Sequence, residues 1–121
     1  MTPTKGRAFL IHWNLSEAEE YAQNLRSAGW QVEIEAGDGA RAGNAIKVDP
    51  PQVVVIYLSR LPSHGRETAH ALHSFKVTRN IPIVFVDGKE EAVEKTKVKV
   101  PDAIFTTSEE LEHAIQKISQ E

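Results

Sequence analysis

Four residues with side chains suited to catalysis could meet at one edge of a sheet. His12, Tyr57, His64 and Asp87 each lie at or shortly after the end of a short apolar run. Parallel strands would bring such positions to the carboxyl edge, where an imidazole could act as a general base beside a phenol and an orienting carboxylate. We favour the competing interpretation, in which the rings fill this space and Asp87 caps the turn after its run. Catalysis needs an open pocket, and these side chains are bulky enough to fill one.

Two further patterns carry weaker chemical signals. Glu67, His70 and His73 are spaced three apart, as metal ligands on one helix face can be. The sequence offers no second helix with ligands, so a solvated polar face is the favoured interpretation. The glycine-rich segment 37–43 does not follow the first apolar run and lacks a dinucleotide fingerprint. We therefore predict no metal and no cofactor.

Composition restricts the possible functions. The 121 residues are 40% hydrophobic and 26% charged, which suits a single domain over residues 1–121 with flexible ends at about 1–6 and 119–121. A net charge of -3 argues against direct binding of nucleic acid. The sequence has no cysteine, and no apolar stretch is long enough to span a membrane or to form a signal-peptide core. We expect a cytoplasmic location without membrane contact.

Continuous apolar runs indicate the strands. Residues 53–58, Val-Val-Val-Ile-Tyr-Leu, show no alternation, which is typical of a strand buried on both faces of a parallel sheet. The sequence Pro-Ser-His-Gly at 62–65 predicts a loop after this strand. Residues 8–11, 81–86 and 103–105 predict further strands. The alternating segment 31–35 predicts a strand at a half-exposed edge.

Apolar residues at helical spacing predict the first helix. Ser16 and Glu19 resemble a capping box at its start, and Gly29 is expected to end it. The apolar stripe of this helix would face the sheet, and Glu17 would be among the residues that face water.

Four further helices are predicted, at about residues 42–46, 66–77, 89–96 and 107–118. Phe75 lies on the apolar stripe of the 66–77 helix, and Glu91 and Lys95 form an i,i+4 pair in the next. Thr107 with Glu110 forms a second capping box. The fivefold alternation of strand and helix argues for an α/β fold, a doubly wound parallel sheet with right-handed crossovers.

This repeat resembles the receiver domain of bacterial two-component response regulators over essentially the whole chain. The loop 59–65 is similar to the family's phosphorylation-site loop, with its proline and terminal glycine. Asp38-Gly39 is similar to the Asp-Gly pair that follows the family's second strand. The resemblance implies a flavodoxin-like (CheY-like) three-layer sandwich with one five-stranded sheet in the order 2-1-3-4-5.

The residues that give receivers their activity are replaced in this sequence. His12 and Trp13 stand where receivers have the acidic pair that holds magnesium, and Tyr57 stands where they have the phospho-accepting aspartate. Asp87 replaces the Thr or Ser after the fourth strand that contacts the phosphoryl oxygens, and Thr107 or its neighbour replaces the lysine after the fifth strand. Magnesium needs several oxygen ligands, an acyl phosphate needs a carboxylate nucleophile, and phosphoryl transfer needs nearby cations. The resemblance therefore implies a pseudo-receiver that cannot be phosphorylated and is not an enzyme.

The resemblance also implies signalling through protein contact. Receivers commonly use the face formed by their fourth helix, fifth strand and fifth helix, which also serves as a dimer surface. That face here would cover residues 89–97, 105 and 111–117, with the contact residues Lys89, Lys95, Lys97, Phe105, Leu111 and Lys117. From charge alone, the lysines of this segment indicate a solvated face rather than a docking patch. The expected partner is an unidentified protein, and a homodimer is one form of this contact.

Two other functions stay open. A small-molecule sensor could use the space left by the missing acids, and an unfamiliar enzyme could use His12, Tyr57 and Asp87. A cavity near Tyr57 and Asp87 would favour the sensor. Uptake of phosphate from acetyl phosphate and magnesium would overturn the pseudo-receiver interpretation.

Overall fold

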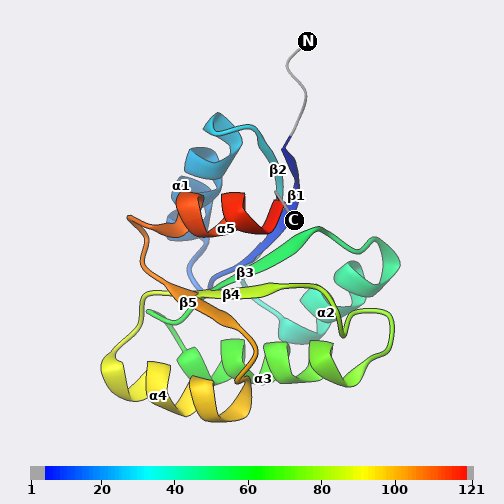
Figure 1. The fold of residues 1–121 in the computed structure, drawn as a ribbon, viewed down its shortest axis with the longest axis vertical. Coiled ribbons are helices and arrows are strands. Elements are labelled where there is room, and N and C mark those ends of the chain that lie inside the picture. Colours follow the sequence, from blue (N-terminus) through cyan, green and yellow to red (C-terminus); the bar gives the residue numbers. More distant parts are fainter. Residues whose placement is uncertain (1–4, 120–121) are drawn as a thin grey trace.

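Strands and helices alternate along the chain, as Figure 1 shows for the computed structural model, which describes residues 5–119. The strands are β1 (Gly6–Ile11), β2 (Trp30–Glu35), β3 (Val53–Tyr57), β4 (Ile83–Val86) and β5 (Ile104–Thr106). The helices are α1 (Leu15–Ser27), α2 (Gly39–Val48), α3 (Pro62–Ser74), α4 (Glu90–Lys99) and α5 (Leu111–Ser119). Residues 1–4 and 120–121 of the predicted flexible ends lie outside the described residues, whereas Gly6 begins β1 and Ser119 ends α5.

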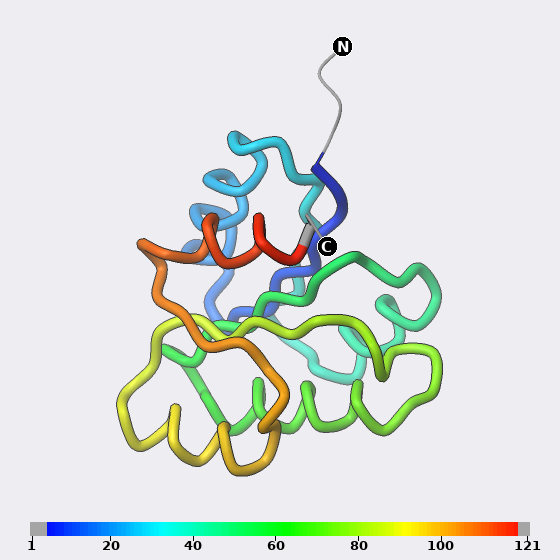
Figure 2. Tube along the Cα trace, viewed as in Figure 1, coloured from blue at the N-terminus to red at the C-terminus, as the bar shows by residue number. Residues whose placement is uncertain are grey.

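The five strands form one parallel sheet in the order β2-β1-β3-β4-β5, which confirms the predicted fold. Helices α1 and α5 cover one face, and α2, α3 and α4 cover the other (Figure 2). Val55 and Tyr57 point to the α1/α5 side and Val54 and Ile56 to the opposite side, so every residue of β3 is buried. Two buried faces explain why this run shows no alternation.

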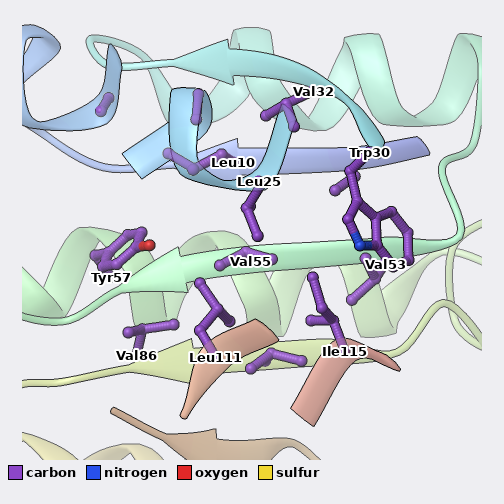
Figure 3. Packing of buried hydrophobic residues seen from close by; sticks show 14 residues of the cluster. Leu10, Leu25, Trp30, Val32, Val53, Val55, Tyr57, Val86, Leu111 and Ile115 are labelled. Carbon is purple, nitrogen blue, oxygen red and sulfur yellow. The ribbon is translucent and has the colours of Figure 1, made fainter. Parts of the chain in front are cut away.

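The first core cluster connects the sheet to α1 and α5. Figure 3 shows Leu25 of α1 and Leu111 of α5 on the same side of β3 as Val55 and Tyr57.

No helix in residues 5–119 has the length and apolar character needed to cross a membrane.

Helix α1 begins differently from its prediction. The cap is Asn14, whose side-chain oxygen accepts a hydrogen bond from the backbone N–H of Glu17 at 3.0 Å. The predicted cap at Ser16 is therefore wrong, because Ser16 already lies within the first turn. Asn and Ser are both good caps, and their nearness made the choice ambiguous.

Helix α3 begins at Pro62, four residues earlier than predicted. Proline is tolerated in a first turn because its missing N–H would have no partner there. The predicted loop over 59–65 therefore shrinks to the residues before Pro62, and Leu61 takes a left-handed conformation with φ of 43°. Phe75 caps the end of α3 and is exposed rather than on its apolar stripe.

Two local pairs appear as predicted. The backbone N–H of Glu110 donates to the hydroxyl of Thr107 at 3.3 Å, just before α5. Glu91 and Lys95 form an ion pair at 3.1 Å on the exposed side of α4.

Candidate functional site

Three aromatic rings occupy the carboxyl edge of β1 and β3. The centroid of the His12 ring lies 5.0 Å from that of Tyr57 and 5.5 Å from that of Tyr21 on α1. Tyr21 stacks on Tyr57 with 4.2 Å between centroids and 13° between planes. His12 is 0% exposed and Tyr57 is 1% exposed. Sequence reasoning placed His12 and Tyr57 at this edge but did not identify Tyr21 as the ring that seals it.

The imidazole of His12 is bound to Glu17, which the sequence had placed in water. Nε2 of His12 lies 2.8 Å from Oε1 of Glu17, and Glu17 also forms an ion pair with Arg60 in the loop after β3. A carboxylate only accepts hydrogen bonds, so Nε2 carries the proton of this bond. Nδ1 of His12 is buried without a partner in the described part of the chain. The ring is therefore held in place by Glu17 and walled in by the two tyrosines.

Both tyrosines stay protonated in the neutral range. Burial raises the pKa of Tyr57 strongly, and its electrostatic interactions with Tyr21 and Asp87 raise it further. Burial also raises the pKa of Tyr21, with further contributions from the carboxylates of Asp87 and Glu17. An uncharged phenol enclosed by other rings is a poor nucleophile.

Asp87 ties the end of β4 to the segment after β5. Its carboxylate accepts a hydrogen bond from the backbone N–H of Ser108 at 2.9 Å and another from the Ser108 hydroxyl. Asp87 itself is left-handed, with φ of 59°, a conformation that aspartate tolerates better than most residues. The prediction that Asp87 caps its own turn is corrected, because its partner lies 21 residues further along the chain.

Trp13 and His64 lie on the other side of the sheet. The Trp13 indole packs with the cluster beneath α2 and α3, and its ring meets that of His64 edge-on at 5.6 Å. His64 is exposed in the first turn of α3. The predicted convergence therefore holds for His12 and Tyr57 but does not include His64.

The residues at this edge do not fit a magnesium ion. Magnesium requires near-octahedral oxygen ligands. The carboxylate of Glu17 is bound by His12 and Arg60, and that of Asp87 is bound by Ser108. Within residues 5–119, no group of three or more His, Asp or Glu side chains could hold a metal ion. On α3, Glu67 pairs with Lys99 at 2.6 Å.

Two carboxylates at this edge of the sheet should make the fold sensitive to acid. Hydrogen bonds from Arg60 and then His12 lower the pKa of Glu17 from 4.5 to about 2. Arg41, with the backbone N–H groups of Gly37 and Asp38, lowers that of Glu35 to about 2. A carboxylate whose pKa falls on folding stabilises the protein above its unfolded pKa, and this contribution is lost as the pH falls.

We therefore expect the free energy of unfolding in urea to fall between pH 4.5 and about 2. Glu17→Gln and Glu35→Gln should each make this pH dependence shallower. Glu90, an exposed carboxylate in the first turn of α4, provides the matched control Glu90→Gln. Equal slopes for all three variants would contradict the assignment.

The predicted contact face contains a cleft between β5 and α5. The cleft has a volume of about 540 Å³, and its lining includes Ile104, Phe105, His113 and Lys117. The ammonium group of Lys97 on α4 lies 5.5 Å from the centroid of the Phe105 ring. Leu111 is only 4% exposed and packs in the α1/α5 core, so its predicted place on this face is corrected.

The other lysines of this face lie on or beside α4. Lys95 pairs with Glu91, and Lys97 pairs with Glu94 at 3.7 Å, both within α4. Lys89 is exposed just before the helix begins. Pairs of this kind on one helix are typical of a solvated surface and give little binding energy of their own.

Comparison with known proteins identifies the fold. No family model matches this sequence, and no curated protein matches it. A protein from Chloroflexus aurantiacus J-10-fl that is assigned as a response regulator superposes with a TM-score of 0.82 at 18% identity, covering 99% of this chain and 100% of the other. A CheY-like receiver domain from Methylobacillus flagellatus gives a TM-score of 0.78 at 19% identity, with 97% and 99% coverage.

A third similar structure was solved with a metal. The receiver domain of a sensor histidine kinase from Pseudomonas aeruginosa PAO1 has a magnesium ion coordinated in its active-site cleft. Its TM-score is 0.75 at 18% identity, with coverage of 96% of this chain and 98% of that one. At such low identity these matches show that the chain has the receiver fold, and they leave its activity to be argued from its own residues.

Proposed function

We propose that this domain is a receiver-like signalling module that cannot be phosphorylated and that acts by contact with another protein. The observation that carries the proposal is the stack of Tyr21 on Tyr57 at the end of β3, with His12 beside it. An acyl phosphate forms only on a carboxylate, and here the corresponding position bears a buried, protonated phenol.

The charges around this edge support the same proposal. Phosphoryl transfer needs cations beside the transferring group. Arg60 reaches this edge through its ion pair with Glu17, and that pair occupies both side chains. Thr107, at the position of the family's lysine, is neutral and caps the turn before α5.

Catalysis by His12, Tyr57 and Asp87 is not part of the proposal. Nε2 of His12 is bound to Glu17, and the raised pKa of Tyr57 keeps its proton in place at neutral pH. The Asp87 carboxylate is held by Ser108 rather than by His12. A general base needs an unprotonated site that a substrate can reach, but the free Nδ1 of His12 is buried, Tyr57 keeps its proton and the Asp87 carboxylate is occupied by Ser108.

The face that we propose for contact is formed by α4, β5 and α5. It presents Ile104, which is 37% exposed, beside the cleft lined by Phe105. Exposed apolar side chains rimmed by charged ones are typical of protein contact sites. The partner is another protein, and a second copy of this chain is included in the proposal. A cytoplasmic location belongs to the same proposal, and the absence of cysteine is compatible with it.

Substitutions in this face should abolish partner binding. We expect Ile104→Asp, and separately Lys97→Glu, to remove the protein that co-purifies with the tagged chain from its native cells. The loss of a buried contact or a reversed charge at an interface commonly costs 10-fold or more, about 1.4 kcal/mol. Sedimentation equilibrium at several concentrations would detect self-association in the same variants.

Val48→Asp is the matched control for Ile104→Asp. Val48 is a similar aliphatic side chain at 86% exposure on α2, away from this face. Binding should survive this change. If binding survives Ile104→Asp and Lys97→Glu but is lost in Tyr57→Phe, the partner instead uses the strand-end residues, and the proposed face is wrong.

A further inference from the structure

A groove runs between α1 and the start of α5, beside the stacked tyrosines. Its volume is about 370 Å³, within the range of small-molecule sites. Tyr21 and Asn24 line it from α1, Tyr57 from the end of β3, and Ser108, Glu109 and Glu112 from the segment that leads into α5. Leu25 and Leu111 add an apolar surface.

The hydroxyl of Tyr57 is available to a ligand in this groove. Tyr57 is 1% exposed, yet it lines the groove, and Figure 3 shows it on the same side of β3 as Leu25 and Leu111. Among the residues that the structure describes, the hydroxyl has no hydrogen-bond partner. The hydroxyl is not among the fully buried polar atoms without a partner, so it faces the groove, and a ligand that hydrogen-bonds to it would take the place of water there.

The groove has a negative electrostatic character. None of its lining residues is basic, whereas Glu109 and Glu112 are both acidic. The carboxylates of Asp87, Glu17 and Glu20 each help to raise the pKa of Tyr21, and Arg60, which is paired with Glu17 and also interacts with Tyr21, offsets part of this charge. Such a field favours a cation and disfavours an anion.

We propose that this groove binds a small organic ammonium ion with an apolar body. The ammonium N–H donates a hydrogen bond to the Tyr57 hydroxyl, Glu109 and Glu112 balance the charge, and Leu25 and Leu111 contact the apolar part. Glu112 also lies in the first turn of α5, where it compensates the positive end of that helix. Part of its charge is therefore already balanced, and binding is expected to be weak and sensitive to salt.

This proposal gives the small-molecule alternative a chemical class and does not rest on the loss of phosphoryl transfer. The test uses three probes of similar shape, namely phenethylammonium, neutral 2-phenylethanol and anionic phenylacetate. Each is titrated into the ¹⁵N-labelled chain at pH 7 while amide shifts are recorded. We expect phenethylammonium to bind about tenfold more tightly than 2-phenylethanol, with shifts concentrated in residues 21–27 and 108–112.

Variants assign the binding to the groove. Tyr57→Phe keeps the ring and should weaken phenethylammonium binding about fivefold through one lost hydrogen bond. Glu112→Gln should weaken it about threefold. Glu90→Gln, which removes the same charge on the opposite side of the sheet, should have no effect.

Three results would overturn the proposal. These are equal affinities for the charged and neutral probes, shifts that fall outside residues 21–27 and 108–112, and an unchanged affinity in both Tyr57→Phe and Glu112→Gln. Absence of saturable binding by phenethylammonium would overturn it as well. None of these results bears on phosphorylation, so failure here is distinguishable from failure of the proposed function.

Discussion

Replacement of Tyr57 by aspartate is expected to lower the free energy of unfolding by about 3 to 5 kcal/mol. The change removes a large buried ring and its stack with Tyr21, and it places a carboxylate beside the buried His12. Nearby Asp87 adds repulsion, because the two carboxylates would face the same enclosed edge. Urea unfolding at pH 7 measures the effect.

Tyr57→Phe is the matched control because it keeps the ring and the stack. Within residues 5–119 the Tyr57 hydroxyl has no hydrogen-bond partner, so the free energy of unfolding should change by less than about 1 kcal/mol. A Tyr57→Asp chain as stable as the original would contradict the description of this edge. It would show that the edge has room and water for a carboxylate.

The substitution Gly88→Ala is expected to destabilise the fold by about 2 to 4 kcal/mol. Gly88 has φ of 101°, and an added Cβ would lie 2.7 Å from Cβ of Leu58. The backbone strain and the clash add, because Leu58 is buried and cannot move away freely. The same turn positions Asp87, so its bond to Ser108 should weaken too. Thermal unfolding and the amide shift of Ser108 report the two effects.

Gly43→Ala is the control for this change. Gly43 lies within α2, and an added Cβ would point into open space. Alanine is the better helix former, so this variant should gain about 0.5 to 1 kcal/mol. If both variants gained stability, the turn after β4 would not have the tight geometry described here.

The sheet could be predicted from the sequence because its signals are local. The unbroken apolar run of β3 requires two covered faces, and the alternation of β2 requires an edge. These patterns, with the helical stripes between them, predict a doubly wound parallel sheet with right-handed crossovers, whereas the strand order was implied by the resemblance to receiver domains. The starts of α1 and α3 were missed because Asn14 and Ser16 are both good caps and because Pro62 was interpreted as a helix breaker.

The contacts of the candidate site could not be predicted, because they join distant parts of the chain. Arg60 meets Glu17 across 43 residues, and Ser108 meets Asp87 across 21. The position of Glu17 on its helix predicted a side chain in water, whereas it is bound by His12 and by Arg60 of the loop after β3. The place of Tyr21 on α1 was visible as an apolar position, but its stacking on Tyr57 depends on the packing of α1 against β3.

The central claim is that this receiver fold has lost the groups that bind magnesium and accept phosphate. The most direct test is intact-mass spectrometry of the chain after incubation with acetyl phosphate and magnesium, beside an active receiver as a positive control. We predict that the control gains the mass of one phosphoryl group and that this chain keeps its original mass. A magnesium-dependent gain of that mass on this chain would contradict the account.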